Sequence, residues 1–168
     1  ANQLDILLAV EAVAFGGTLR GDEAVTPFPG TQGNRVDAGQ LGDGTTTDSL
    51  SPVAVKTVAN ATQITTDAYQ NCVLRSDGLV KCWGSNAWGE LGENRTEKSL
   101  APVVAKGISQ PVDLSGSDKS HTCVVADDGV VKCWGNNLEG QLGDGSTKDS
   151  SAGVAVSGIS SAVQVIGG

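Results

Sequence analysis

Two stretches of the chain, residues 72–82 and 123–133, carry the same pattern of apolar and polar positions. In each, apolar residues recur at alternate positions on both sides of a polar triplet that ends in glycine, Ser76-Asp77-Gly78 or Asp127-Asp128-Gly129. Such a triplet is typical of a three-residue hairpin loop whose glycine adopts the left-handed conformation. Each stretch therefore predicts a β-hairpin made of two short antiparallel strands.

The four cysteines lie at the ends of these two hairpins. The loop placement sets Cys72 opposite Cys82, and Cys123 opposite Cys133. Opposed residues of an antiparallel pair are about 4.5–5.5 Å apart at Cα, within reach of a disulfide. We therefore predict two disulfides. The alternative is two pairs of buried thiols in a cytosolic protein, and a zinc site is less favoured because the close Cys-x-x-Cys pairs of such sites are missing.

The chain repeats itself with a period of about 50 residues, which is typical of propeller blades with four short strands each. A Gly-x-Leu-Gly loop recurs at residues 39–42, 89–92 and 140–143. The repeat region spans residues 11–168, and its first copy is degenerate, without cysteines. Residues 1–10 have no counterpart. We predict an all-β fold of about three four-stranded blades, as a partial ring or as an open stack that assembles.

Composition and charge narrow the classes of function. Glycine is abundant, with 23 residues, whereas only six residues are aromatic, which favours short strands and tight turns. The net charge of −8 repels nucleic acid and anionic membranes, so DNA or chromatin binding is disfavoured. The most apolar run, residues 6–15, is too short to span a membrane and is not an intact signal peptide. Paired cysteines indicate an extracellular or cell-surface protein, with the periplasm as the alternative.

Catalysis is disfavoured by the inventory of reactive side chains. The only histidine, His121, precedes a predicted disulfide cysteine, and Gln70 takes its place in the preceding copy, which indicates packing. The acidic loops 42–48 and 143–149 offer oxygens to calcium, but they lack the ligand alternation of a helix-loop-helix site. Asp, Gly and Thr also form turns on their own, so we favour turns over calcium. We expect no enzyme activity, no cofactor and no metal.

Tryptophan is the residue type that most clearly separates packing from contact positions. Trp83 and Trp134 occupy the same repeat position, which favours packing between blades. Trp88 instead replaces the acidic residues Asp37 and Glu139 of the other copies, which predicts an exposed ring. Because tryptophan is enriched in binding hot spots, Trp88 is the leading partner contact. The other predicted contacts are the loop residues Asn86, Arg95 and Glu97.

The repeated motif carries a family resemblance. The run Cys133-Trp134-Gly135-Asn136-Asn137 and the glycine loop that follows it resemble the regulator-of-chromosome-condensation repeat. The resemblance implies a β-propeller, typically of seven blades, which three repeats cannot close. A part of a larger propeller, or an oligomer, is therefore expected. The disulfide-bearing form resembles secreted or surface-exposed members and also resembles the propeller-type inhibitors of β-lactamase.

These observations favour a non-enzymatic extracellular recognition module that binds a protein or a glycan through its propeller loops. One alternative is a structural subunit of a surface appendage or fibre that assembles through its open ends, with residues 6–15 as the joining segment. The other alternative is a propeller-type enzyme inhibitor, which depends on the resemblance alone. Acidity and disulfides disfavour guanine nucleotide exchange.

Overall fold

The computed structural model describes residues 18–20, 23–25, 38–47, 53–67 and 69–168. Those residues form short strands and turns and contain no α-helix. The strands described are β1 (Thr18–Arg20), β2 (Glu23–Val25), β3 (Ala61–Thr66), β4 (Gln70–Arg75), β5 (Val80–Gly84), β6 (Ser99–Val104), β7 (Pro111–Ser117), β8 (His121–Ala126), β9 (Val131–Gly135) and β10 (Ser150–Ala155). In this part of the chain no helix is long and apolar enough to cross a membrane.

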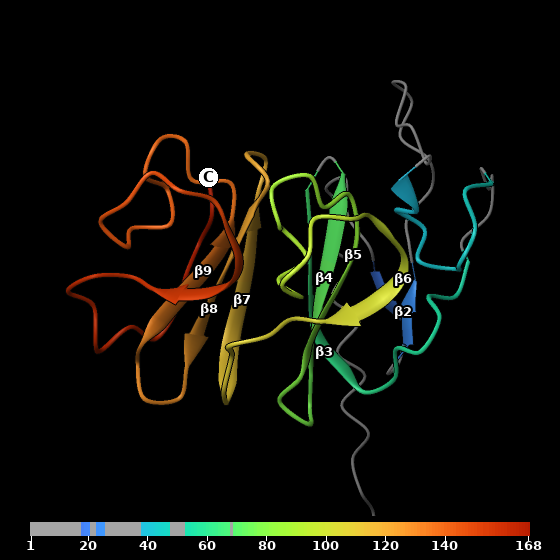
Figure 1. The fold of residues 1–168 in the computed structure, drawn as a ribbon. Coiled ribbons are helices and arrows are strands. Elements are labelled where there is room, and N and C mark those ends of the chain that lie inside the picture. Colours follow the sequence, from blue (N-terminus) through green and yellow to red (C-terminus); the bar gives the residue numbers. More distant parts are fainter. Residues whose placement is uncertain (1–17, 21–22, 26–37, 48–52, 68) are drawn as a thin grey trace, which may run out of the picture.

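The strands form two consecutive four-stranded antiparallel sheets that lie face to face (Figure 1). We call β3–β6 the first blade and β7–β10 the second blade. The hairpin β1–β2, from the degenerate first copy, is a separate two-stranded sheet that contacts β3. The predicted all-β fold with four-stranded propeller blades is confirmed. The predicted boundary of the repeat region after residue 10 lies outside the described residues.

The hairpin register agrees with the sequence pattern in both blades. Cys72 pairs with Cys82 across β4 and β5, and Cys123 pairs with Cys133 across β8 and β9. Both predicted disulfides are present. The loop glycine Gly129 has a φ of +79°, the left-handed value that this hairpin class requires.

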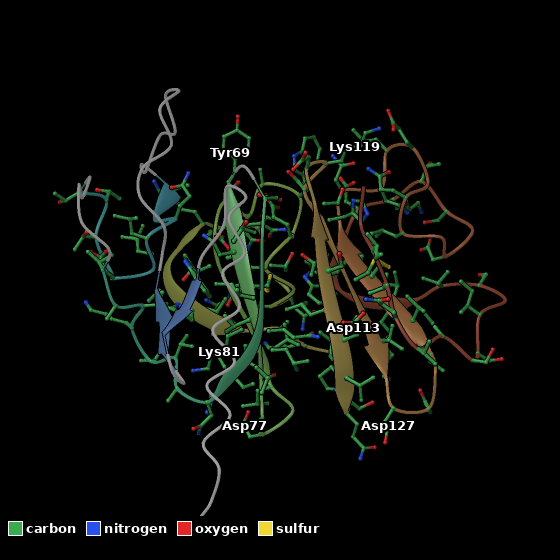
Figure 2. All side chains as sticks on the ribbon, turned by 180° about the vertical axis from the view of Figure 1, so that it is seen from behind. Tyr69, Asp77, Lys81, Asp113, Lys119 and Asp127 are labelled. Carbon is green, nitrogen blue, oxygen red and sulfur yellow. A yellow bond between two sulfur atoms is a disulfide. The ribbon has the colours of Figure 1, made fainter. Side chains whose placement is uncertain are left out.

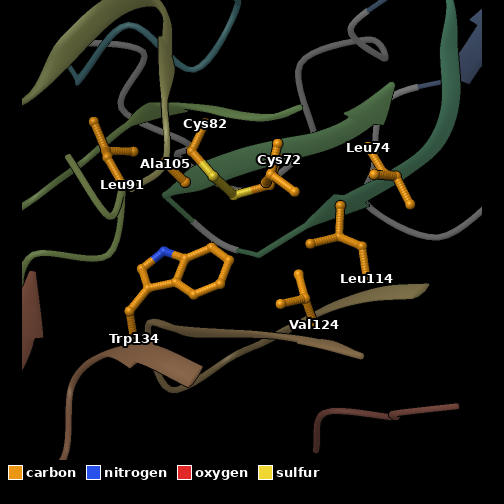
Figure 3. Packing of buried hydrophobic residues seen from close by; sticks show 9 residues of the cluster. Cys72, Leu74, Cys82, Leu91, Ala105, Leu114, Val124 and Trp134 are labelled. Atoms are coloured by element: carbon orange, nitrogen blue, oxygen red, sulfur yellow. A yellow bond between two sulfur atoms is a disulfide. The ribbon is translucent and has the colours of Figure 1, made fainter. Parts of the chain in front are cut away.

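The main apolar core lies between the two blades (Figure 3). Its centre is the buried indole of Trp134, which packs on side chains of the first blade and donates from Nε1 to the carbonyl of Glu90 at 2.8 Å. Trp83 repeats this bond one period earlier and donates to the carbonyl of Gln40 at 2.9 Å. The predicted packing of these two tryptophans between repeats is thereby confirmed.

The Gly-x-Leu-Gly loops supply the opposite wall of this contact. In all three copies the amide of the second glycine donates to the carbonyl of the first, at 2.9 to 3.0 Å. Gly92 has a φ of +72°, and a Cβ there would lie 2.8 Å from Trp134 Nε1. Glycine is therefore required both by the backbone conformation and by the close approach of the indole.

The sequence repeat and the structural blade are out of phase. Residues 153–155 belong to β10, the last strand of the second blade. Residues 162–168 then run along β7, where the amide of Gly167 donates to Ser115 Oγ at 2.8 Å. The amide of Gly116 makes the same bond to Thr65 Oγ1 between the blades, at 2.7 Å. Residues 162–168 therefore lie against the second blade as β7 lies against the first.

Candidate interaction site at the loop end of the blades

The blades have long loops at one end and tight hairpin turns at the other (Figure 2). We define the loop end as residues 67, 69, 85–98, 118–120 and 136–149, and the hairpin end as the tight turns around Asp77 and Asp127. Tyr69 and Lys119 project from the loop end, and Asp77 and Asp127 lie at the opposite end. Long irregular loops on a rigid scaffold are the usual carriers of binding residues.

The first blade exposes two aromatic side chains at the loop end, Tyr69 and Trp88, which we call the aromatic pair. Tyr69 is 53% exposed and Trp88 is 39% exposed. Ser85 connects them: its amide donates to the Tyr69 carbonyl at 2.8 Å, and its hydroxyl donates to Glu90 Oε1 at 3.0 Å. Glu90 Oε2 then accepts from the amide of Trp88 at 2.7 Å. The backbones of both aromatic residues are therefore held in one hydrogen-bonded frame.

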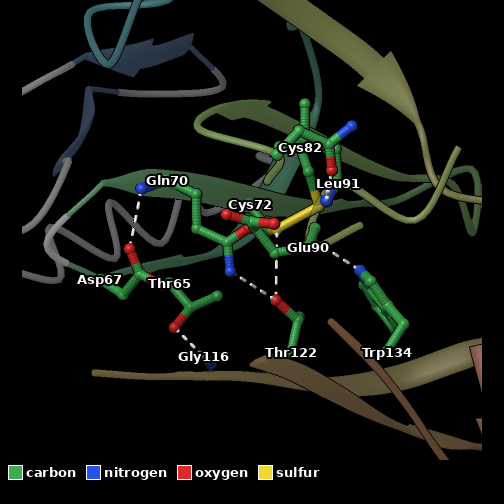
Figure 4. The surroundings of a disulfide bond; sticks show 11 residues. Thr65, Asp67, Gln70, Cys72, Cys82, Glu90, Leu91, Gly116, Thr122 and Trp134 are labelled. Carbon is green, nitrogen blue, oxygen red and sulfur yellow. Dashed lines mark hydrogen bonds between the residues drawn. A yellow bond between two sulfur atoms is a disulfide. The ribbon is translucent and has the colours of Figure 1, made fainter. Parts of the chain in front are cut away.

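Two carboxylates underlie this frame. Glu90 is 1% exposed. Asp67 Oδ1 accepts from the amide of Tyr69 at 2.7 Å and from that of Gln70 at 2.8 Å, and Figure 4 shows the second of these bonds. Burial raises the pKa of Asp67 to about 6, and the charge of Glu90 adds to the rise, against the two backbone N–H groups that lower it. The aromatic pair is therefore held on two poorly solvated carboxylates, those of Glu90 and Asp67.

The second blade repeats the frame with other side chains. The amide of Asn136 donates to the Ser120 carbonyl at 2.9 Å, as Ser85 does to Tyr69. The amide of Glu139 donates to Gln141 Oε1 at 2.8 Å, as Trp88 does to Glu90. The pairs Tyr69 and Ser120, Trp88 and Glu139, and Glu90 and Gln141 are therefore structural equivalents.

A cavity of about 260 Å³ lies at this place in the second blade, lined by Lys119, Ser120, Asn136, Leu138, Glu139 and Gln141. At its rim Lys119 Nζ contacts Glu139 Oε2 at 2.7 Å. The hydrogen bond and the charge of Lys119 lower the pKa of Glu139. Ser120 and Glu139 line one cavity, so their equivalents Tyr69 and Trp88 flank the corresponding place in the first blade.

The structure separates the predicted contact residues into two groups. Trp88, Arg95 and Glu97 are exposed in or beside the loop after β5. Asn86 is 1% exposed and does not offer a surface, which corrects its prediction as a contact. Its Nδ2 donates to the carbonyls of Arg95 and Glu97 at 3.1 and 2.9 Å, so it fixes the loop from inside.

Two exposed residues of the loop end, Tyr69 and Leu138, were not among the sequence predictions. Tyr69 is the only tyrosine of the chain and stands where the next copy has Ser120. Leu138 stands where the preceding copy has Ala87. The signal that selected Trp88, a large apolar side chain at a position that is small or polar elsewhere, also applies to both.

The remaining candidate sites have structural explanations. His121 is buried at the start of β8, and burial and Lys119 lower its pKa. In the acidic loops, Asp43 Oδ1 accepts from the amide of Thr45 at 2.8 Å, and Asp144 Oδ1 accepts from that of Ser146 at 2.9 Å. These bonds are those of Asp-initiated turns. Within the described ranges no three His, Cys, Asp or Glu side chains cluster as a metal site. That these loops form turns and do not bind calcium stays a prediction.

Comparisons with known proteins identify the class of fold. A family model described as the regulator of chromosome condensation (RCC1) repeat matches residues 112–141, from β7 into the loop after β9. The crystal structure of human WBSCR16 matches with a TM-score of 0.70 and 20% identity, over 90% of this chain and 39% of that one. The structure of Kap60 bound to yeast RCC1 (Prp20) matches with a TM-score of 0.65 and 13% identity, over 87% and 38%.

These matches show that the chain consists of β-propeller blades. The RCC1 repeat itself is matched over residues 112–141, which confirms the resemblance stated from the sequence. The chain spans about two fifths of the length of the two proteins that it matches, with coverages of 39% and 38%.

Proposed function

We propose that the chain is a non-enzymatic recognition module of the extracellular space that binds a protein or a glycan through its loop end. The RCC1-type propeller fold is that of a protein-interaction module. The observation that carries the proposal is the aromatic pair, two large rings exposed on a frame of buried hydrogen bonds. Exposed aromatic residues on a rigid support are typical of interface hot spots.

Two further features support the proposal. Both disulfides favour an oxidising compartment, where such bonds form and persist. The chain has a single histidine, which is buried in a strand, and this disfavours nucleophilic catalysis.

Site-directed photocrosslinking in the native extracellular material tests this function. A photoreactive phenylalanine analogue at Trp88 or Leu138 samples the loop end, and the same analogue at Asp77 or Asp127 samples the hairpin end. We expect one defined crosslinked species from the loop end and none from the hairpin end. Equal crosslinking from both ends, or none from either, contradicts the proposal. Alkylation before lysis tests location: protected thiols support the extracellular space, and four free thiols contradict it.

A second candidate function is assembly as a structural subunit. It is supported by residues 162–168, which lie along β7 and expose Val163 and Ile166 at 88% and 82%. The double variant Val163→Lys with Ile166→Lys is expected to dissociate any oligomer, as measured by light scattering over a range of concentrations. A mass that is monomeric at every concentration in the unmodified chain contradicts assembly.

A further inference from the structure

We propose that the aromatic pair of the first blade binds a cationic side chain, the guanidinium or ammonium group of an arginine or lysine in a basic segment of a protein partner. This inference rests on the proposed function and adds the chemistry of the partner. It depends on three features of the loop end: the exposed rings, the carboxylates beneath them, and the cation held at the same place in the second blade.

The rings supply the first element of a cation site. Trp88 and Tyr69 are aromatic residues whose ring faces attract Lys and Arg, more strongly where the cation is desolvated. Their backbones are tied through Ser85 and Glu90, so the two segments that carry the rings are held in place before binding. Preorganisation of this kind lowers the entropic cost of association.

The carboxylates supply the second element. Glu90 receives hydrogen bonds from Ser85 Oγ and the Trp88 amide, and Asp67 receives them from the amides of Tyr69 and Gln70. All these donors are neutral. Among the described residues, neither carboxylate forms an ion pair with a Lys or Arg. The negative charge beneath the rings is thus left for a cation from outside, in a chain whose net charge is −8.

The second blade shows what this place accommodates. There Lys119 Nζ contacts Glu139, the equivalent of Trp88, at 2.7 Å beside the 260 Å³ cavity. The residue before Tyr69 is Ala68, whereas the residue before Ser120 is Lys119. The second blade therefore has the ammonium group of Lys119 at this place, where the first blade has the rings of Tyr69 and Trp88.

Acid is expected to weaken the binding. The charged side chain that acts on Asp67 is that of Glu90, and the facing groups of Tyr69 and Gln70 are neutral N–H donors. Protonation of Asp67 below about pH 6 removes one of the two charges beneath the rings. A bound cation favours the ionised form, so binding also lowers the pKa of Asp67.

The test uses a short arginine-containing peptide of net positive charge, with the same peptide carrying neutral citrulline as its control. Trp83 and Trp134 are buried, so Trp88 is the tryptophan whose fluorescence responds to a ligand at the surface. We expect the arginine peptide to shift this fluorescence in a saturable manner, and to bind about tenfold more tightly than the citrulline peptide.

Two variants introduce into the first blade the residue types that the second blade has at the equivalent positions. The backbone conformation there is therefore compatible with both. Glu90→Gln keeps an acceptor for the Trp88 amide, as Gln141 does for Glu139, but removes the charge. Tyr69→Ser removes one ring. Each is expected to weaken the arginine peptide about threefold to tenfold. The matched control is Asp127→Asn at the hairpin end, which removes one negative charge elsewhere and is expected to leave the affinity unchanged.

Several outcomes overturn the inference. Equal affinity for the arginine and citrulline peptides excludes a cation site, and equal losses in Glu90→Gln and Asp127→Asn reduce the binding to the overall charge of the protein. If the arginine peptide fails to bind while Trp88 crosslinks a partner, the cation site is wrong and the recognition function stands. If the peptide binds as expected while crosslinking from the loop end fails, the site stands and the recognition function is wrong.

Discussion

The first blade and the second blade make the same scaffold from different sequences. Trp83 donates to the Gln40 carbonyl at 2.9 Å, and Trp134 donates to the Glu90 carbonyl at 2.8 Å. Lys81 and Lys132 each donate from Nζ to a backbone carbonyl of the loop before their blade, at 2.7 and 2.6 Å. The two tryptophans lie in the core, where a change of side chain disturbs many neighbours.

The blades diverge at the loop end, where different side chains stand in equivalent positions. Tyr69, Trp88 and Glu90 of the first blade correspond to Ser120, Glu139 and Gln141 of the second, although the backbone bonds at these positions are shared. The loop end can therefore differ from blade to blade while these hydrogen bonds are kept. Substitutions at equivalent positions show whether the two blades depend on them equally.

The largest effect is expected at the tryptophan between the blades. Trp134 is buried in the core between the blades (Figure 3), so Trp134→Ala leaves a cavity there. The free energy of unfolding is expected to fall by about 3–5 kcal/mol. Trp88→Ala, at the half-exposed ring, is expected to lower it by less than about 1 kcal/mol. Urea denaturation measures both. Similar losses in the two variants contradict the division into packing and contact tryptophans.

The disulfides come next. Each closes the same ten-residue separation, so removal of either pair by Cys→Ser is expected to cost about 2–3 kcal/mol in the chain-entropy account. The double variants are Cys72→Ser with Cys82→Ser, and Cys123→Ser with Cys133→Ser. Denaturation with and without reductant measures the two losses. Full stability of the native chain under reductant rules out a clamping role.

The buried asparagines are expected to have a smaller effect, and an unequal one. Asn137 Nδ2 donates to Asp144, Ser146 and Lys148, whereas Asn86 Nδ2 donates to two carbonyls. Each change to Ala is expected to cost about 1–3 kcal/mol, with the larger loss at Asn137. Hydrogen exchange is expected to rise in the loop of the altered blade alone. Exchange that rises equally in both loops indicates that the blades do not hold their loops independently.

A further effect concerns pH and the Asp67 carboxylate of the first blade. The pKa of Asp67 in the folded chain is about 6, above the ordinary 3.8, so its charged form opposes folding. This cost is absent below pH 3.8, grows between 3.8 and about 6, and is complete above.

Relative to Asp67→Asn, the native chain should therefore lose about 2 kcal/mol of stability as the pH rises from about 4 to about 7. Thermal unfolding of both proteins across this range measures the difference. The side-chain amide that Asp67→Asn introduces retains an oxygen acceptor for Tyr69 and Gln70, so the comparison isolates the charge. A pH-independent difference between the two proteins contradicts a raised pKa at Asp67.

Much of the fold follows from local sequence signals. The Asp-Gly loops and the alternating apolar residues act within eleven residues, and they correctly set the hairpin registers and both disulfides. The exposure of Trp88 was also predicted, because the other copies carry acidic residues at its position. The phase of the blades was not predicted, because the sequence repeat begins with the outer strand of the preceding blade.

The site was predicted less completely than the fold. Asn86 has the polarity of a surface residue, yet the loop that it holds closes over it and buries it. Tyr69 lies 19 positions before Trp88, and nothing local in the sequence joins them.

The sequence by itself determined the hairpins, the disulfides, the repeat and the acidic balance, because each depends on residues close together in the chain or on composition alone. The tertiary structure decided which polar side chains are buried and which aromatic residues share a surface. Ser85 connects Tyr69 to Glu90, and Glu90 positions Trp88, only when β4 and β5 are paired and the following loop folds back. Contacts between distant segments depend on packing, and the pattern along the chain does not encode them one residue at a time.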